Sequence, residues 1–358
     1  MEQILRIAIA GQGRSGHDIH ANVLRKDPRF KIVAAADALP ERREQAAQEF
    51  GCPVFESYQE MLDKGPDFDI FVNATPSRFH VDAVMAAVKR AKLVVCEKPS
   101  APTVEIFDNM VKAAKENDCI LYPFQNARFA PYFRKMKEVI DSGVLGKIMY
   151  IRSNWSGFGR RWDWQTRQDQ MAGNLFNTGP HPLDHAIVLF GDAYPQVSAV
   201  LDAYHWDFPG DADNLVLVRL TGDGPVIDLD ISSMQAYKIG TMYNVCGTHG
   251  GLIVDGNTVK WKYFDPEKAP KHEFWQPWSR NREYCSEQLE WIEKEWTYEN
   301  KDSNLNGFEQ IVTALYSDVY EVFCNGKEPE VKLDQVRRQV YVLEEAHKQN
   351  PLPVKPLK

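Results

Sequence analysis

The sequence predicts an α/β domain with a doubly wound parallel sheet, followed by an α+β domain with a large, open-faced and mostly antiparallel sheet. Three observations lead to this fold class. Short apolar runs alternate with helical patterns over about the first 125 residues, longer strand-like runs follow them, and a glycine-rich turn comes directly after the first apolar run. Strand–helix alternation with short links is typical of a parallel sheet covered by helices.

Five short apolar runs in the first part are predicted to be strands buried on both faces, as strands of a parallel sheet are. They cover residues 7–10, 32–36, 70–72, 93–96 and 119–121. Helical patterns lie between them at residues 40–50, 80–90 and 104–116. We assign residues 1–125 to this first domain.

The remaining residues, 126–358, are assigned to the second domain. A helix is predicted at 131–142, where Gly143 ends it. Strands are predicted at 148–155, 197–203, 215–220 and 226–231, with turn signals at 222–225 and 255–257. Two more helices, at 308–325 and 334–349, complete an α+β layer.

The composition argues against several classes of protein. The chain has 358 residues and 41.0 kDa, with 42 Lys plus Arg against 50 Asp plus Glu, a formal net charge of -8. A nucleic-acid-binding protein needs a basic face, which this balance does not favour. No apolar run approaches the roughly 20 residues of a membrane span, and the first residues lack the pattern of a secretory signal. We therefore expect a cytoplasmic protein that binds neither nucleic acid nor membrane.

The cysteines and histidines do not indicate a metal centre. The six cysteines, at positions 52, 96, 119, 246, 285 and 324, form no C-x-x-C pair. Their spacing suits neither a disulfide framework nor a structural zinc site. His181 and His185 form only a weak pair, so no metal is expected, and the cysteines are expected to be reduced and packed as small apolar residues.

The glycine-rich turn, Gly11-Gln12-Gly13-Arg14-Ser15-Gly16, follows a predicted strand and opens a predicted helix. This is the context that a dinucleotide-binding, or Rossmann, motif requires. Gly11 allows the tight turn, Gly13 lets backbone N–H groups approach a pyrophosphate, and Gly16 lets the helix and strand pack closely.

Asp37 ends the second apolar run. A carboxylate at this position can accept hydrogen bonds from both ribose hydroxyls, and it repels a 2′-phosphate. NAD is therefore the expected cofactor and NADP is less favoured. Arg42 and Arg43 lie nearby in the sequence and could soften that preference.

Lys98 follows the apolar run at 93–96, within Cys96-Glu97-Lys98-Pro99. Ligands of open α/β sheets bind beyond the carboxyl ends of the strands, so Lys98 is predicted to lie at the nucleotide crevice. An ammonium group there can donate a hydrogen bond to a substrate oxygen and stabilise charge as an alcohol becomes an alkoxide.

Together with a second motif, these residues resemble the Gfo/Idh/MocA oxidoreductase family over nearly the whole chain. The resemblance rests on the glycine-rich turn, Asp37, Thr75-Pro76, Glu97-Lys98-Pro99 and Ala172-Gly173-Asn174-Leu175-Phe176-Asn177-Thr178-Gly179-Pro180-His181-Pro182-Leu183-Asp184. It implies a Rossmann domain, an open-faced sheet domain, and a homo-oligomer packed through those sheets. It also implies that Lys98 and His181 contact the reacting hydroxyl beside the nicotinamide. The predicted cofactor-binding residues are Gly11, Gly13, Arg14, Ser15, Gly16, Asp37, Arg42, Thr75, Pro76, His80, Glu97 and Lys98.

His181 is predicted to lie in the first turn of a helix, because Gly179-Pro180 resembles a helix start. The positive end of the helix dipole disfavours an imidazolium, so the ring should be mostly neutral near pH 7. A neutral imidazole can accept the hydroxyl proton as hydride leaves the carbon. Asp184, three residues on, could orient the ring.

Asn177 departs from the family pattern, which has Asp at this position. Asn keeps the shape and some hydrogen bonds but carries no charge and cannot act as a base. Two interpretations remain open. Asn177 positions a substrate hydroxyl while Lys98 and His181 manage the proton, or this branch has lost or changed its redox activity; we favour the first.

Aromatic residues with interleaved donors lie between residues 154 and 165, a pattern that suits sugars. The predicted substrate-binding residues are Lys98, Asn126, Arg128, Trp155, Arg161, Trp162, Trp164, Asn177 and His181. A second aromatic cluster, formed by Trp275, Trp278, Tyr284, Trp291 and Trp296, could be a domain core, an oligomer contact or a platform for a glycoside.

The leading hypothesis is an NAD-dependent dehydrogenase that oxidises a secondary hydroxyl of a sugar, polyol or glycoside. Lys98, His181 and Asn177 are its predicted catalytic residues. A second hypothesis is a redox-neutral enzyme that retains NAD while it eliminates a glycosidic substituent or passes hydride to a second sugar. A third is a protein that senses a sugar or NAD without catalysis.

Overall fold

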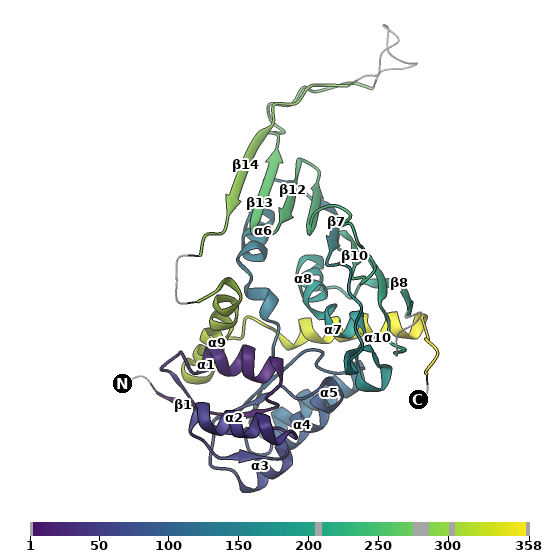
Figure 1. The fold of residues 1–358 in the computed structure, drawn as a ribbon. Helices are drawn as coiled ribbons and strands as arrows, with labels where there is room; N and C mark the ends of the chain where they lie inside the picture. The colour runs from purple at the N-terminus through teal and green to yellow at the C-terminus, as the bar shows by residue number, and fades with distance from the viewer. Residues whose placement is uncertain (1–2, 205–209, 275–285, 301–304, 356–358) are drawn as a thin grey trace.

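The computed structural model describes residues 3–204, 210–274, 286–300 and 305–355. Two β-sheets with their own hydrophobic cores form the two parts of the molecule (Figure 1). The first sheet is parallel and six-stranded, and the second is mostly antiparallel and eight-stranded. The predicted fold class is therefore confirmed.

The first sheet has the strand order β3-β2-β1-β4-β5-β6. Its strands are β1 (Leu5–Ala10), β2 (Phe30–Ala36), β3 (Val54–Phe55), β4 (Ile70–Asn73), β5 (Leu93–Cys96) and β6 (Ile120–Pro123). Strands β4 and β5 are buried along their whole length, as their continuous apolar sequences predict. Strand β3, which has only two, half-buried residues, was not predicted from the sequence. The order reverses beside β1, so a crevice forms between the carboxyl ends of β1 and β4.

Helices connect these strands and cover the sheet. They are η1 (Arg14–Ala21) continued by α1 (Asn22–Leu24), α2 (Pro40–Phe50), α3 (Tyr58–Lys64), α4 (His80–Ala87) and α5 (Val104–Glu116). The predicted helices at 40–50 and 104–116 are confirmed, and α4 ends three residues before the predicted bound. Ser57 and Thr103 cap α3 and α5 by accepting hydrogen bonds from the backbone N–H groups of Glu60 and Ile106.

The second sheet has the strand order β14-β13-β12-β11-β7-β10-β9-β8. Its strands are β7 (Ile148–Asn154), β8 (Gln196–Asp202), β9 (Leu215–Thr221), β10 (Val226–Asp230), β11 (Tyr243–Gly247), β12 (Gly250–Asp255), β13 (Thr258–Tyr263) and β14 (Ile292–Thr297). All pairs except β7–β10 are antiparallel. Buried and more exposed residues alternate along β9, as expected for a sheet with one covered face.

Helices α6 (Pro131–Asp141) and α8 (Pro180–Phe190) pack on the covered face of this sheet, where their apolar residues join its core. Short helical segments η3 (Asn126–Phe129) and α7 (Asn174–Asn177) precede them in the chain. Segment η3 leaves the first sheet just after β6, and α7 leads into α8. Residues of these two segments, Asn126 and Asn177, therefore lie at the crevice of the first sheet.

The last two helices tie the parts together. Helix α9 (Gly307–Asn325) starts with a capping box of Asn306 and Glu309, and its apolar face joins the core of the first sheet. Helix α10 (Leu333–Gln349) contributes Val336 and Val340 to the first core and Leu343 to the second. Helix α10 runs between the two parts (Figure 1), so the two parts share structural elements.

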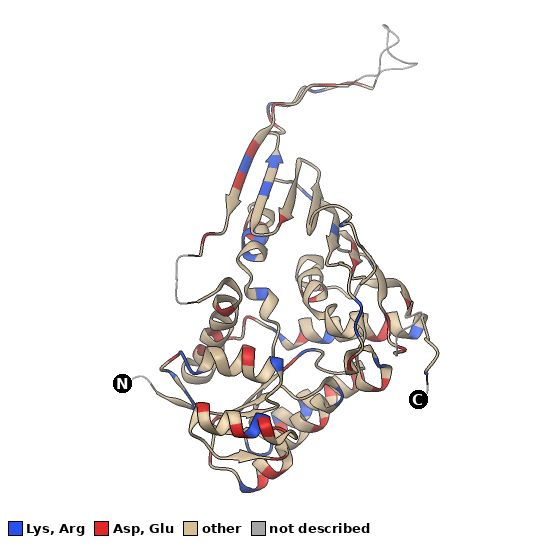
Figure 2. Ribbon diagram, viewed as in Figure 1, with Lys and Arg blue, Asp and Glu red and all other residues tan. Residues whose placement is uncertain are grey.

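Charged residues of both signs are interspersed along the helices (Figure 2). No helix in the described part of the chain is long and apolar enough to cross a membrane. The same ranges contain no group of three or more His, Cys, Asp or Glu residues that could hold a metal ion. Cys52, Cys96 and Cys119 are buried, whereas Cys246 is exposed, so the expectation that the cysteines pack as small apolar residues is wrong for Cys246.

Candidate active site

A cavity of about 880 Å³ opens at the crevice of the first sheet. The glycine-rich turn, Asp37 and Arg42 line one part of it, and Lys98, Asn177 and His181 line another. All of the predicted cofactor-binding residues except Gly16 belong to the lining. The cavity therefore brings together residues that are more than 150 positions apart in the sequence.

The glycine-rich turn is shaped by close backbone packing. Gly11 has a φ of +90°, and a Cβ there would lie 2.2 Å from the carbonyl oxygen of Ala74. A Cβ on Gly16 would lie 1.8 Å from the carbonyl oxygen of Gly11. Around Gly13, by contrast, the guanidinium of Arg42 is the one near neighbour in the described part of the chain, with its Nη1 3.4 Å from the Cβ position. The turn thus keeps open space over Gly13, which fits the approach of a pyrophosphate.

The Asp37 carboxylate is fixed at the end of β2. Its Oδ2 accepts a hydrogen bond from the Gln12 N–H (2.7 Å), and its Oδ1 accepts one from the Leu39 N–H (2.9 Å). Arg42 Nη1 lies 3.6 Å from Oδ2. The carboxylate remains on the cavity wall, where a ribose hydroxyl can add a further hydrogen bond and a 2′-phosphate meets negative charge.

Replacing Asp37 by Ser should shift the cofactor preference from NAD toward NADP by roughly tenfold or more, because the repulsive charge is removed while Arg42 remains. The measurement is the ratio of dissociation constants for NAD+ and NADP+, by fluorescence or calorimetric titration. Glu44→Ser, which removes an exposed carboxylate of α2 outside the cavity lining, is the control. An unchanged ratio in Asp37→Ser would show that Asp37 does not read the ribose.

Lys98 is held at the cavity by the start of the second motif. Its Nζ donates a hydrogen bond to the backbone carbonyl of Asn177 (2.7 Å). The side-chain amide of Asn177 faces the amide of Gln165 instead, with 3.2 Å between Gln165 Nε2 and Asn177 Oδ1. The Lys98 contact therefore does not depend on the side chain at position 177. Gln165, which lines the same cavity, was not among the predicted site residues.

A buried polar network around Glu97 contacts the backbone of Lys98. Glu97 Oε1 accepts hydrogen bonds from the Ser15 hydroxyl and from His20 Nε2 (3.2 Å), and Oε2 accepts one from the Lys98 N–H. Burial opposes ionisation of Glu97, yet the hydrogen bonds and the charges of His20 and Lys98 lower its pKa to about 2. His20 also contacts the Tyr316 hydroxyl (2.6 Å), a partner that no local sequence pattern indicates.

His181 lies in the first turn of α8, as predicted. Burial, reinforced by the charge of Lys98, lowers the pKa of His181 to about 3, so its imidazole is neutral near pH 7. Its Nδ1 is buried and has no hydrogen-bond partner among the described residues. The ring of Trp155 stacks beside it, with 6.0 Å between centroids and 24° between planes.

The predicted orientation of His181 by Asp184 is wrong. Asp184 is buried in a bidentate ion pair with Arg128, with 2.6 and 2.7 Å between the paired atoms. Arg128 also donates hydrogen bonds to Gln335 Oε1 in the first turn of α10 and to the Glu330 carbonyl just before that helix. Arg128, which was predicted to bind substrate, is not part of the cavity lining.

The other predicted substrate-binding residues divide into two groups. Asn126, Arg161 and Trp164 line the cavity. Trp155 and Trp162 are not part of the lining: Trp155 lies behind His181, and Trp162 is 73% exposed. The Asn126 side chain is buried, and its Oδ1, like Nδ1 of His181, has no partner in the described ranges. Because buried polar atoms are usually paired, two orphans at one cavity fit a site for a polar ligand.

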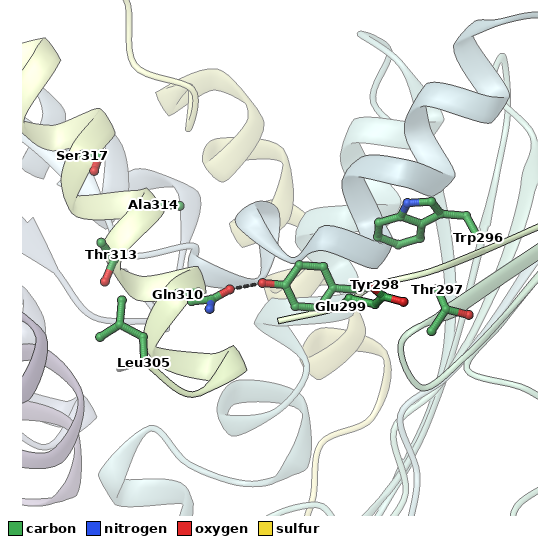
Figure 3. Close-up of a pocket in the computed structure, with 9 residues that line it drawn as sticks. All are labelled: Trp296, Thr297, Tyr298, Glu299, Leu305, Gln310, Thr313, Ala314 and Ser317. Carbon is green, nitrogen blue, oxygen red and sulfur yellow. Dashed lines mark hydrogen bonds between the residues drawn. The ribbon is translucent and has the colours of Figure 1, made fainter. Parts of the chain in front are cut away.

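A second cavity, of about 680 Å³, lies between β14 and α9 (Figure 3). Its lining includes Trp296 and Tyr298, and the Tyr298 hydroxyl donates a hydrogen bond to Gln310. Trp296 also joins the second core as a partly buried residue. Of the other members of the aromatic cluster, Trp291 is 44% exposed; Trp275, Trp278 and Tyr284 lie outside the described residues. None of the predicted catalytic residues lines this cavity.

Comparisons with known proteins agree with this arrangement. Residues 5–125 match a family profile described as an oxidoreductase family with an NAD-binding Rossmann fold, and residues 133–253 match the GFO/IDH/MocA C-terminal domain. Myo-inositol 2-dehydrogenase of Thermotoga maritima is 26% identical over 264 residues, which cover 70% of this chain and 75% of that protein. Levoglucosan dehydrogenase of Pseudarthrobacter phenanthrenivorans is 30% identical over 62% of this chain and 59% of its own. The crystal structure of an NAD-binding protein from Listeria innocua superposes with a TM-score of 0.78, at 23% identity, and covers 99% of this chain and 100% of that one.

Proposed function

Because this chain belongs to the Gfo/Idh/MocA family of NAD-binding oxidoreductases, we propose that it oxidises a secondary hydroxyl of a sugar, polyol or glycoside and passes the hydride to NAD+. One observation carries the proposal: a lysine and a neutral histidine line the same cavity as the glycine-rich turn. The relatives that are named inositol and levoglucosan dehydrogenases support a polyhydroxylated substrate.

The first 125 residues hold the cofactor in this proposal, and residues 126–358 bind the substrate. The turn from Gly11 to Gly16 would hold the pyrophosphate, and Asp37 would hold the adenosine ribose. Thr75, Pro76 and His80 would line the path between the pyrophosphate and Lys98. Bound NAD+ supplies the hydride acceptor.

Lys98 and His181 both act on the reacting hydroxyl, Lys98 as a hydrogen-bond donor and His181 as the proton acceptor. The Lys98 ammonium donates a hydrogen bond to the substrate oxygen and stabilises the negative charge that grows as the O–H bond breaks. The neutral His181 imidazole accepts the proton. Glu97, fixed as a carboxylate behind Lys98, favours the charged form of the lysine against the cost of burial.

Asn177 has a positioning role in this account. Its backbone carbonyl holds Lys98 Nζ, and its side-chain amide pairs with Gln165 at the cavity wall. Either amide can exchange this mutual contact for a substrate hydroxyl at little cost, because both offer a donor and an acceptor. Asn126, Arg161 and Trp164 complete the proposed substrate pocket. We also propose a homo-oligomer that packs through the exposed face of the second sheet.

The test is a screen for NADH formation, by absorbance, with NAD+ and a panel of myo-inositol, scyllo-inositol, levoglucosan, glucose and simple glycosides. We expect sustained NADH production with at least one compound. Mass spectrometry of the denatured protein for released nucleotide is the companion measurement. Retained NAD together with a transformed compound and no NADH would favour the redox-neutral cycle instead. Nucleotide binding with no transformed compound would favour the sensing protein.

The activity should decline at alkaline pH, and the decline should begin below the pKa of an ordinary lysine. Burial lowers the pKa of Lys98 from its usual 10.5, with Arg14 and Arg161 adding to the effect against Glu97. The neutral amine, which cannot stabilise an alkoxide, therefore forms at a lower pH than in a free lysine. The measurement is kcat/KM against pH. Lys98→Arg keeps its charge throughout, so its residual activity should lose this alkaline decline; the same decline in Lys98→Arg would assign it to another group.

A further inference from the structure

His181 lacks the hydrogen bond that usually fixes a catalytic imidazole. Its Nδ1 has no partner among the described residues, and Asp184, the nearest acid in sequence, is committed to Arg128. The tautomer and orientation of such a ring are commonly set by a hydrogen bond to its second nitrogen. Here the neighbour that does contact the ring is Trp155, whose indole is stacked beside it.

Trp155 follows β7 and is itself held by a chain of hydrogen bonds. Its Nε1–H donates to the Tyr243 hydroxyl at the start of β11 (3.0 Å). That hydroxyl lies 2.7 Å from Nδ1 of His185, and Nε2 of His185 lies 2.8 Å from the carbonyl oxygen of Ala127. The chain thus links β7, β11, α8 and η3.

The direction of every bond in the chain is determined by its ends. The Ala127 carbonyl can only accept, so Nε2 of His185 carries a proton and donates it. Burial lowers the pKa of His185 to about 3, so the ring is neutral and its Nδ1 is an acceptor. The Tyr243 hydroxyl therefore donates to Nδ1, and its oxygen accepts from the indole N–H of Trp155, whose nitrogen can only donate.

This row of hydrogen bonds, from Trp155 to Ala127, is held in place because its central side chains are buried. His185 and Tyr243 are 0% and 1% exposed, and the His185 ring stacks on Phe133 with 3.7 Å between centroids and 5° between planes. At its far end, Ala127 is the neighbour of Asn126, a cavity residue whose Oδ1 is unpaired. One fixed network therefore supports two residues of the proposed substrate pocket, His181 through stacking and Asn126 through its backbone.

We infer that Tyr243 and His185 are positioning residues, which hold the plane of Trp155 and through it the ring of the catalytic His181. This inference rests on the proposed function. The two residues contact neither substrate nor cofactor in this account. Stacking on a fixed indole takes the place of the carboxylate that would otherwise orient His181. Because a small displacement of a catalytic group can cost about a hundredfold in rate, loss of the network should affect turnover more than binding.

Tyr243→Phe removes one hydroxyl and with it the hydrogen bonds to Trp155 and His185. We expect kcat for the panel compound that is oxidised fastest to fall roughly ten- to a hundredfold, with KM for that compound and for NAD+ within about threefold. The matched control is Tyr122→Phe, which removes another fully buried tyrosine hydroxyl, the donor to Asp318. The control should keep the wild-type kcat. A wild-type kcat in Tyr243→Phe, or an equal fall in both variants, would overturn the inference.

A second readout does not depend on activity. Long-range ¹H–¹⁵N spectra of histidine-labelled protein should show His185 protonated on Nε2 alone, and the ring signals of His181 should move in Tyr243→Phe but not in Tyr122→Phe. Unmoved His181 signals in Tyr243→Phe would overturn the positioning role even if no panel compound is oxidised. The expected shifts in a protein that binds NAD but oxidises nothing would instead leave the network in place and contradict the proposed function.

If Tyr243→Phe does not fold, Trp155→Phe provides the same test from the other end of the chain. It keeps an aromatic ring beside His181 but removes the indole N–H donor together with one ring of the indole, while the bond between Tyr243 and His185 is retained. We again expect a lower kcat, an unchanged KM and moved His181 signals. Wild-type values for all three would overturn the inference.

Discussion

Replacing Lys98 by Ala should lower kcat by roughly a thousandfold, because Lys98 is the one lysine among the described residues that line the cavity; removing one such donor commonly costs about a hundred- to a thousandfold. The affinity for NAD+ should stay within a few-fold, since Lys98 Nζ is bound to the Asn177 carbonyl rather than to the glycine-rich turn. Steady-state kinetics and a nucleotide titration measure the two effects separately.

Lys89→Ala is the control for this variant, because Lys89 is an exposed lysine outside the cavity lining. It should retain the wild-type rate. A Lys98→Ala protein that turns over at the wild-type rate would remove Lys98 from the reaction. A loss of NAD+ binding that accounts for the whole loss of activity would assign Lys98 to the cofactor instead.

Replacing His181 by Ala should lower kcat by roughly a hundred- to ten-thousandfold, the usual contribution of a general base. The pKa of His181, lowered to about 3 by burial, keeps the base in its active form above that pH, so the loss should be present across the neutral range. His272→Ala, which removes an exposed histidine paired with Glu287, serves as the control and should leave kcat unchanged.

The double variant Lys98→Ala/His181→Ala tests whether the two residues act on the same oxygen. Two groups that act on one oxygen are coupled, so the combined loss should be smaller than the product of the single losses. Fully multiplicative losses would mean that the two residues act at separate points. A His181→Ala protein with wild-type kcat would contradict the role of the imidazole altogether.

Local patterns were sufficient to predict most of the first sheet and its helices. Residues 93–96 are continuously apolar and form the buried strand β5, and α2 begins at Pro40 and ends before Gly51 in the left-handed conformation, as helix signals predict. Strand β3 was missed because two half-buried residues carry no periodic signal. The bounds of β7 to β10 were predicted to within one residue, since each is a distinct strand-like run, and the turn signal at 222–225 separates β9 from β10.

The association of α9 with the first core could not be predicted in the same way. Its apolar face shows that it packs against something, but not against which sheet. In the structure Leu315, Tyr316 and Val319 lie in the first core, close to residues near the start of the chain. Which sheet α9 packs against depends on the path of the whole chain rather than on any local pattern.

The cavity residues that follow strand ends were also predictable, because the carboxyl ends of parallel strands meet at one edge. Asp37 follows β2 and Glu97 follows β5, and both line the cavity. The partners of site residues were not predictable, since they come from distant segments. Arg128 and Asp184 are 56 residues apart, Trp155 and Tyr243 are 88 apart, and His20 and Tyr316 are 296 apart.

The most direct test of hydride transfer from carbon follows the fate of deuterium. The protein would be incubated with NAD+ and panel compounds that carry deuterium on their CH–OH carbons, and both products would be analysed by mass spectrometry. We expect deuterated NADH together with a ketone from the same compound. A transformed compound with no deuterium in NADH, or bound NAD+ with every compound unchanged, would contradict it.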